Sequence, residues 1–283
     1  MSALLSGCWW QQPGFSPEHS GWNPFENELR PDNVAAVVPQ WSVTVAGSTT
    51  APGTLSEPVT SRDLVFSKRQ VGGTAASVQA VDIDSGDLVW EHTLPAPGFS
   101  VTDLAVPVAF SRDELRVGHI ARFPFGPPCG DLTRLDPASG DLLGTTATDF
   151  PTSAVVSAGT ITAQMESNRC FAPVSGQLVV RDQATSAVLW TAPLGNAEVK
   201  AAPTVALAQG RIYVNDRGTV HAFAIDGCGA PTCSPLWSFA SPGFDGPVVA
   251  ARDDLVFVIE SFRETPPPPE PGVGFGIVRA LSA

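Results

Sequence analysis

The sequence predicts an all-β fold made of repeated four-stranded units, and three observations support this prediction. A motif of an apolar strand, an Asp, a turn and a strand ending in Trp recurs along the chain, most clearly at residues 78–90 and 178–190. It recurs about every 44 to 50 residues, a period typical of repeat architectures. No stretch shows sustained helical periodicity, so each repeat is expected to be a sheet.

Each strand of the repeat can be placed by aligning the units. The first strands of five units begin at equivalent positions: Pro58, Pro107, Ser153, Pro203 and Pro247. Turns containing Gly or Asp separate them from second strands such as residues 64–67, 211–214 and 255–259. The third strand carries Asp82, Asp136 and Asp182, and the fourth ends at Trp90, Trp190 and Trp237, with Gly144 in the second unit. Four antiparallel strands per unit indicate a β-propeller with four-stranded blades.

The two ends of the chain bear on the number of blades. The fifth unit supplies three strands up to Ala283, whereas a strand expected at residues 40–45, which contains Trp41, precedes the first unit. Pairing of that strand with the fifth unit would close the ring and leave no open sheet edge at the seam. We therefore expect five blades closed by the Trp41 strand. A fragment of a larger ring is the alternative.

The repeated residues have roles in the scaffold that need no ligand. Asp and Gly shape the hairpin between the third and fourth strands, because Asp bonds to its own downstream backbone and Gly accepts positive φ. The Trp side chains fill the space between neighbouring blades, so blade packing is expected at Trp41, Trp90, Trp190 and Trp237. A ring of exposed aromatic residues that stacks on sugars is the functional alternative.

Near the N-terminus the residues Leu5-Ser-Gly-Cys8 resemble the lipobox of bacterial lipoproteins. The apolar segment before it is short and has no basic region, so it corresponds to a truncated signal peptide, and lipidation is expected at Cys8. The chain divides accordingly into residues 1–8 as this signal remnant, 9–39 as a lead-in segment and 40–283 as the propeller.

The other four cysteines pair by their positions in the repeat. Cys228 and Cys233 flank a short hairpin, and Cys129 and Cys170 lie at equivalent places in adjacent units. Two disulfides, Cys228–Cys233 and Cys129–Cys170, would indicate an oxidising, extracytoplasmic location. Zinc binding at the Cys-x4-Cys pair is the competing interpretation. It lacks a second ligand pair, since the four histidines fall in unrelated strands and loops, so no metal site is assigned.

Composition limits the classes of partner. The net charge is −12, which disfavours nucleic acids and anionic lipid surfaces as partners. No apolar run is long enough for a transmembrane helix, so membrane attachment is expected through the lipid alone. Arg, Ala, Gly, Pro and Val are abundant, whereas Lys occurs only at Lys68 and Lys200. This composition suggests a bacterial source with a GC-rich genome.

The repeat motif, Ala-x-Asp-x-x-Ser/Thr-Gly-x-x-x-Trp, resembles that of the PQQ-binding-like β-propeller superfamily. This quinoprotein-type family includes dehydrogenases and a non-catalytic lipoprotein scaffold of outer-membrane assembly. Residues 10–26 and the Cys-bearing hairpin at 226–237 resemble those of secreted bacterial members. The dehydrogenases of the family hold their quinone with adjacent cysteines, which this chain lacks. The resemblance therefore implies a scaffold without a cofactor.

The sequence contains no catalytic motif for a triad, a phosphate loop, a zinc protease or a calcium loop. The favoured function is therefore an exported, lipid-anchored module that binds an unknown protein at its long-loop face, without catalysis. That face comprises the loops at residues 69–77, 122–130, 168–176 and 262–274, which are equally explained as tolerated insertions. The alternative is a hydrolase or oxidoreductase in the central funnel, with Glu57, Asp103 and Asp245 as its candidate carboxylates.

Overall fold

A computed structural model gives the fold of the chain. It describes residues 39–42, 54–56, 58–71, 75–94, 108–111, 114–120, 130–147, 152–168, 175–195, 205–216, 219–240, 245–252, 255–263 and 274–282. The regular structure in these ranges consists of strands, which confirms the predicted all-β class. No helix that is long and apolar enough to span a membrane occurs in them.

The strands form five sheets in chain order. Sheet 1 contains β1 (Thr54–Leu55), β2 (Val59–Thr60), β3 (Leu64–Val71), β4 (Ala75–Asp82) and β5 (Leu88–Thr93). Sheet 2 contains β6 (Val108–Ser111), β7 (Glu114–Ile120), β8 (Gly130–Leu135) and β9 (Leu142–Ala147). Sheet 3 contains β10 (Thr152–Ala158), β11 (Ile161–Asn168), β12 (Ser175–Asp182) and β13 (Val188–Leu194).

The last two sheets follow the same plan. Sheet 4 contains β14 (Val205–Ala208), β15 (Arg211–Asp216), β16 (Thr219–Ala224) and β17 (Trp237–Ala240). Sheet 5 contains β18 (Asp245–Arg252), β19 (Leu255–Arg263) and β20 (Gly274–Ser282). Strands next to each other in the chain pair antiparallel within each sheet, apart from β1 and β2, which both pair with β3. The repeat derived from the sequence is thus confirmed.

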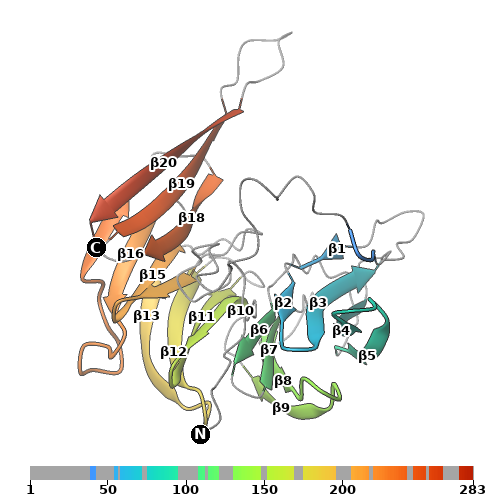
Figure 1. Cartoon of the computed structure of the whole chain (residues 1–283). Helices are drawn as coiled ribbons and strands as arrows, with labels where there is room; N and C mark the ends of the chain where they lie inside the picture. The colour runs from blue at the N-terminus through green and yellow to red at the C-terminus, as the bar shows by residue number, and fades with distance from the viewer. Residues whose placement is uncertain are drawn as a thin grey trace, which may run out of the picture.

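The sheets follow one another around an arc, from the blue sheet 1 to the red sheet 5 (Figure 1). The first strands lie next to each other along this arc, with β2 beside β6, β6 beside β10, β10 beside β14 and β14 beside β18. No comparable contact joins sheet 5 to sheet 1 in the part of the chain that the structure describes. The arrangement is that of propeller blades, and closure of the ring is not seen in these residues.

Two details of the predicted strands need correction. The fourth strand does not end at Trp, because β5 and β13 begin two residues before Trp90 and Trp190 and continue three or four residues beyond them. The expected strand at residues 40–45 is also not formed at residues 40–42, which are irregular. Residues 43–45 lie outside the described ranges, so no pairing with β20 is observed.

The predicted turns between third and fourth strands are present. Asp82 Oδ1 accepts hydrogen bonds from the backbone N–H groups of Asp84 and Ser85, at 3.0 and 2.8 Å. Asp136 Oδ1 accepts the same pair of bonds from Ala138 and Ser139. These bonds stabilise the carboxylate form and lower the pKa of both Asp side chains, chiefly through the N–H of Ser85 and of Ser139.

Apolar side chains fill three of the four junctions between neighbouring sheets. Sheets 1 and 2 share a cluster that includes Phe66, Val78 and Leu115, and sheets 3 and 4 share one that includes Met165 and Phe223. Sheets 4 and 5 pack through Tyr213, Val220, Val256 and Val258, with others. Between sheets 2 and 3 the described apolar cluster consists of Ala109, Leu132 and Val155. That junction therefore depends on other contacts.

Candidate functional site: the junctions and outer edges of the sheets

A Trp side chain docks onto a turn of the next sheet at the first of these junctions. The indole N–H of Trp90, on β5, donates to the backbone carbonyl of Pro137 at 3.0 Å. Trp190, on β13, makes the equivalent bond to Ile225 at 3.2 Å. In both cases the acceptor is the residue that follows the Asp position of the repeat. Each Trp therefore joins two successive sheets through one hydrogen bond and a large apolar contact.

Trp41 makes the same contact although it precedes sheet 1. Its indole N–H donates to the carbonyl of Ile83 at 2.8 Å, and the Gln40 side chain donates to the carbonyl of Asp84 at 3.0 Å. Trp41 thus occupies the position that the fourth-strand Trp of a preceding blade would take.

The turns that receive a Trp carry Gly for a steric reason. A Cβ atom on Gly140 would lie 2.6 Å from Trp90, and one on Gly86 would lie 2.7 Å from Trp41. Both glycines also have positive φ, at +74° and +77°, which side chains disfavour. The Gly of the repeat is therefore needed both for the turn and for the approach of the indole.

The junction between sheets 2 and 3 replaces this contact with a buried arginine. Gly144 stands at the Trp position, and Ser186 stands at the Gly position, with φ of +60°. A guanidinium N–H of Arg116, on β7, donates to the backbone carbonyl of Gln183. Gln183 follows Asp182, so its carbonyl is the one that an indole N–H accepts elsewhere. Arg116 therefore supplies the hydrogen bond of the missing Trp.

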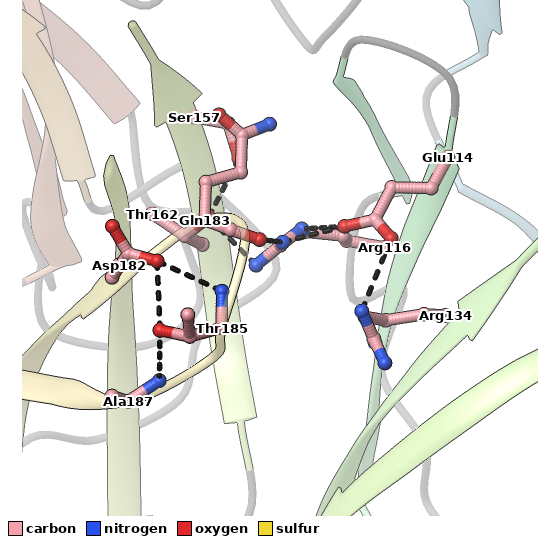
Figure 2. A network of polar contacts seen from close by, with 9 residues as sticks. All are labelled: Glu114, Arg116, Arg134, Ser157, Thr162, Asp182, Gln183, Thr185 and Ala187. Atoms are coloured by element: carbon pink, nitrogen blue, oxygen red, sulfur yellow. Dashed lines mark hydrogen bonds and ion pairs between the residues drawn. The ribbon is translucent and has the colours of Figure 1, made fainter. Parts of the chain in front are cut away.

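Arg116 is held from both sheets (Figure 2). Its Nε donates to Glu114 Oε1 at 2.8 Å, and its Nη1 donates to Thr162 Oγ1 of β11 at 2.8 Å. The second carboxylate oxygen of Glu114, Oε2, lies 3.4 Å from Nη1 of Arg134. The guanidinium of Arg134 lies over Gly144, since a Cβ there would be 2.9 Å from Arg134 Nη2. Two guanidinium groups thus occupy the space of one indole.

The electrostatics of Arg116 follow from its burial. Its side chain is 0% exposed, and this desolvation lowers its pKa, whereas the carboxylate of Glu114 acts in the opposite direction. An arginine remains protonated at neutral pH even so. Glu114 and the acceptors on sheet 3 therefore compensate a charge that would otherwise be costly to bury.

The face of sheet 3 that meets this junction is polar as well. Glu166, which is 1% exposed, accepts hydrogen bonds from Gln164, Gln177 and Arg181. Thr162 lies on the same face of β11 and also contacts Ser157 Oγ at 3.2 Å. This junction is therefore a network of buried charged and polar side chains in place of an apolar core.

The network is suited to holding two sheets together, because its carboxylates are engaged by neighbouring donors. In the described residues no group of three His, Cys, Asp or Glu side chains is placed to hold a metal ion.

A disulfide-bonded loop also connects sheets 3 and 4. Cys228 and Cys233, the pair that the sequence predicts, are joined by a disulfide in the segment between β16 and β17. The loop reaches the outer strand of sheet 3, where Thr191 N donates to the carbonyl of Pro231 and Cys233 N donates to that of Thr191, at 2.9 and 2.8 Å. Cys233 is buried beside Trp190 in the apolar cluster, whereas Cys228 is exposed. We name residues 228–233 the clasp.

Most of the other predicted site residues lie outside the described ranges. These are Cys8, Cys129, Cys170, Glu57 and Asp103, together with most of the long-loop face. Asp245 is the first residue of β18 and pairs with Ser261 through the backbone register, but its side chain is not described. The side chains of the candidate funnel carboxylates thus all lie outside what the structure describes.

Sequence reasoning missed Arg116, although a signal was available. The second unit lacks its Trp, and the turn of the third unit lacks its Gly, as Gly144 and Ser186 show. Since the Gly makes room for the Trp of the preceding unit, the two losses belong to one junction. Their joint occurrence could have indicated a different contact between sheets 2 and 3.

Sheets of antiparallel strands, joined by Trp-to-turn contacts, are arranged as the blades of a β-propeller. Residues 128–261 match the family model described as outer membrane protein assembly factor BamB. The matched residues run from β8 into β19. The resemblance to PQQ-like propeller repeats that the sequence predicts is therefore confirmed.

Comparison with one solved structure supports the fold. The crystal structure of BamB from Moraxella catarrhalis is similar with a TM-score of 0.50 and 17% identity, covering 86% of this chain and 61% of that one. Hsv2 of Kluyvelomyces marxianus is similar with a TM-score of 0.47 and 12% identity, covering 81% and 71%. The chain thus spans less than two thirds of that BamB chain. No curated protein matches the sequence.

Proposed function

We propose that this chain is an exported protein-binding scaffold, held at the bacterial cell membrane by a lipid on Cys8 and without catalytic activity of its own. The observation that carries the proposal is the match of residues 128–261 to the family model of an outer membrane protein assembly factor. The carboxylates of the half-buried Glu114 and the buried Glu166 are bonded to neighbouring side chains, which fits a structural role for both. The lipobox and the cysteines support export.

The scaffold is proposed to be a ring of five blades. Sheet 5 has three strands among the described residues, whereas each other sheet has at least four. Trp41 is docked on sheet 1 as the fourth-strand Trp of a preceding blade would be. Residues 43–45, the rest of the strand expected at 40–45, then supply the fourth strand of sheet 5 by pairing with β20. The long-loop face of this ring is the proposed site for a protein partner.

The experiment is capture of partners by the lipidated full-length chain expressed in its native membranes. A specific protein should be recovered after cross-linking, and intact mass should show a lipid on Cys8. The Cys8→Ala variant is the matched control and should leave the membrane fraction. Recovery of no specific protein would overturn the binding role, and an unmodified Cys8 would overturn the anchor.

A further inference from the structure

The outer edge of sheet 3 is already covered by an extended segment of the same chain. The clasp lies along β13, with Thr232 bridged to Thr191 in the parallel direction. The backbone N–H and C=O of Thr191 both point away from the sheet, since they bond to Pro231 and Cys233 of the clasp. The fourth strand of this fold therefore accepts one further strand-like segment at the residue after Trp.

Two other outer strands have the same register and no such cover in the described residues. Thr191 pairs with Val179 of β12, Glu91 pairs with Gln79 of β4, and Thr145 pairs with Thr133 of β8. In all three strands the register shifts at the same place. The shift lies between the first residue of the strand and its Trp, or the Gly144 that replaces Trp in β9. Glu91 and Thr145 therefore direct their N–H and C=O groups outward. Both residues are exposed, whereas Thr191 is partly covered.

Each of these open edges begins with an exposed apolar pair, and the equivalent pair of β13, Val188 and Leu189, is also exposed beside the clasp. Leu88 and Val89 of β5 are 56% and 50% exposed, and Leu142 and Leu143 of β9 are 55% and 48% exposed. An open strand edge with apolar side chains is a template for pairing with another chain.

The charge around the edges selects the kind of chain that fits. Asp87 and Asp141 directly precede the apolar pairs, and Asp84 is exposed in the turn before β5. The whole chain carries a net charge of −12. A second copy is therefore repelled, and so are residues 9–38, which carry four acidic residues against one Arg. Basic side chains would be attracted.

We propose that the outer edge of β5 and the outer edge of β9 each bind an extended, basic segment of a partner protein. The segment adds a strand to the sheet and repeats the contact that the clasp makes with β13. Backbone bonds to Glu91 and Thr145 hold the segment, and its apolar residues cover the pairs at Leu88 and Leu142. Its Lys or Arg side chains face Asp87 and Asp141. The inference rests on the proposed scaffold function and assigns it a second surface, formed by the outer strands β5 and β9.

The test uses the full-length chain and a fluorescent peptide of alternating lysine and valine, Lys-Val-Lys-Val-Lys-Val-Lys, with a Glu-Val peptide of the same length as control. The basic peptide should bind, and its affinity should fall with salt. The double variant Glu91→Pro and Thr145→Pro should bind it at least about tenfold more weakly, a loss of about 1.4 kcal/mol. Proline is tolerated on edge strands where the N–H faces outward.

Further variants keep the test decisive. Leu88→Ser with Leu142→Ser should weaken binding even if the proline variant does not fold, whereas Val188→Ser with Leu189→Ser on the covered edge should not. Cys228→Ser with Cys233→Ser should free the edge of β13 and add a binding site. Equal binding of both peptides, or full binding by the folded edge variants, would overturn the inference. A captured native partner that still binds the proline variant would overturn it and leave the scaffold function intact.

Discussion

Arg116 shows how one residue can take over a repeat contact. Its guanidinium donates to the carbonyl that accepts an indole N–H at other junctions, and Arg134 fills the space above Gly144. The exchange replaces an apolar contact by buried charges, which are stable only while each has its partners. Positions 116, 134, 144 and 186 therefore form one unit, and changing one of them alone should be costly.

The variant Arg116→Met tests this dependence. It removes the donor to Gln183 and Thr162 and leaves Glu114 with Arg134 alone, so the free energy of unfolding should fall by about 1 to 3 kcal/mol. The measurement is urea unfolding followed by Trp fluorescence. Combining Arg116→Phe, Arg134→Ala, Gly144→Trp and Ser186→Gly restores the pattern of the first junction and should recover most of the loss. A combined variant less stable than Arg116→Met would contradict this account.

Gly140 provides a second test at the level of one residue. Gly140→Ala should reduce the free energy of unfolding by more than about 1 kcal/mol, because the new Cβ meets Trp90 at 2.6 Å and φ is positive. Gly210 is the matched control, since its φ is +72° and a Cβ there would meet nothing within 4 Å. Thermal unfolding of both variants separates steric from conformational cost. Equal losses would show that the Trp contact is unimportant.

At the scale of elements, the fold could be predicted from the sequence because its pattern is local. The turns at Asp82 and Asp136 form through bonds within four residues, and the strands alternate with them. Their spacing alone placed the five sheets in order. The contacts of the outer edges were not predictable, because the clasp reaches β13 from a turn of the next sheet. No local pattern encodes that partner.

The clasp makes a further prediction at this scale. Cys228→Ser with Cys233→Ser should lower the free energy of unfolding by about 2 kcal/mol, because the disulfide closes a short loop. Amide hydrogen exchange should also rise in β13, where Thr191 loses its cover. The free energy of unfolding and the exchange in β13 should be measured on the double variant and on the native chain after reduction of the disulfide. The two samples should give the same values. Unchanged exchange in β13 would show that the loop stays in place without the disulfide.

At the scale of the whole molecule, stability should depend on pH through His221. Its ring lies 2.7 Å from Ser238 Oγ and 4.0 Å from Asp216, and burial lowers its pKa, with the Asp216 carboxylate acting in the opposite direction. The unfolded chain therefore binds the proton more readily than the folded one. Stability is lost as the pH falls through the unfolded value of 6.5. Urea unfolding across this range should show a steeper loss for the native chain than for His221→Asn. Parallel curves would exclude His221 as the cause.

The candidate site was predicted less well than the fold, for a physical reason. Residues such as Asp82 serve the scaffold in three of the five units, so their pattern carries the architecture and not the binding surface. Arg116 departs from the repeat by making a different contact between sheets 2 and 3. The open edges at Glu91 and Thr145 are recognised only by comparison with β13, whose edge is covered from the next sheet. Contacts of this kind depend on which sheets are neighbours in the folded chain, and a local sequence pattern does not specify those neighbours.

Closure of the ring is the last property of the whole molecule that can be tested. Trp41→Ala removes the indole that docks on Ile83 and Gly86 of sheet 1. If residues 43–45 also pair with β20, amide hydrogen exchange should rise in two places far apart in the sequence, the turn at residues 82–87 and the strand at residues 274–282. Trp90→Ala is the matched control and should affect sheets 1 and 2 without raising exchange in β20. Exchange that rises only at residues 82–87 would mean that another segment completes sheet 5, because loss of a strand that pairs with β20 must expose its N–H groups.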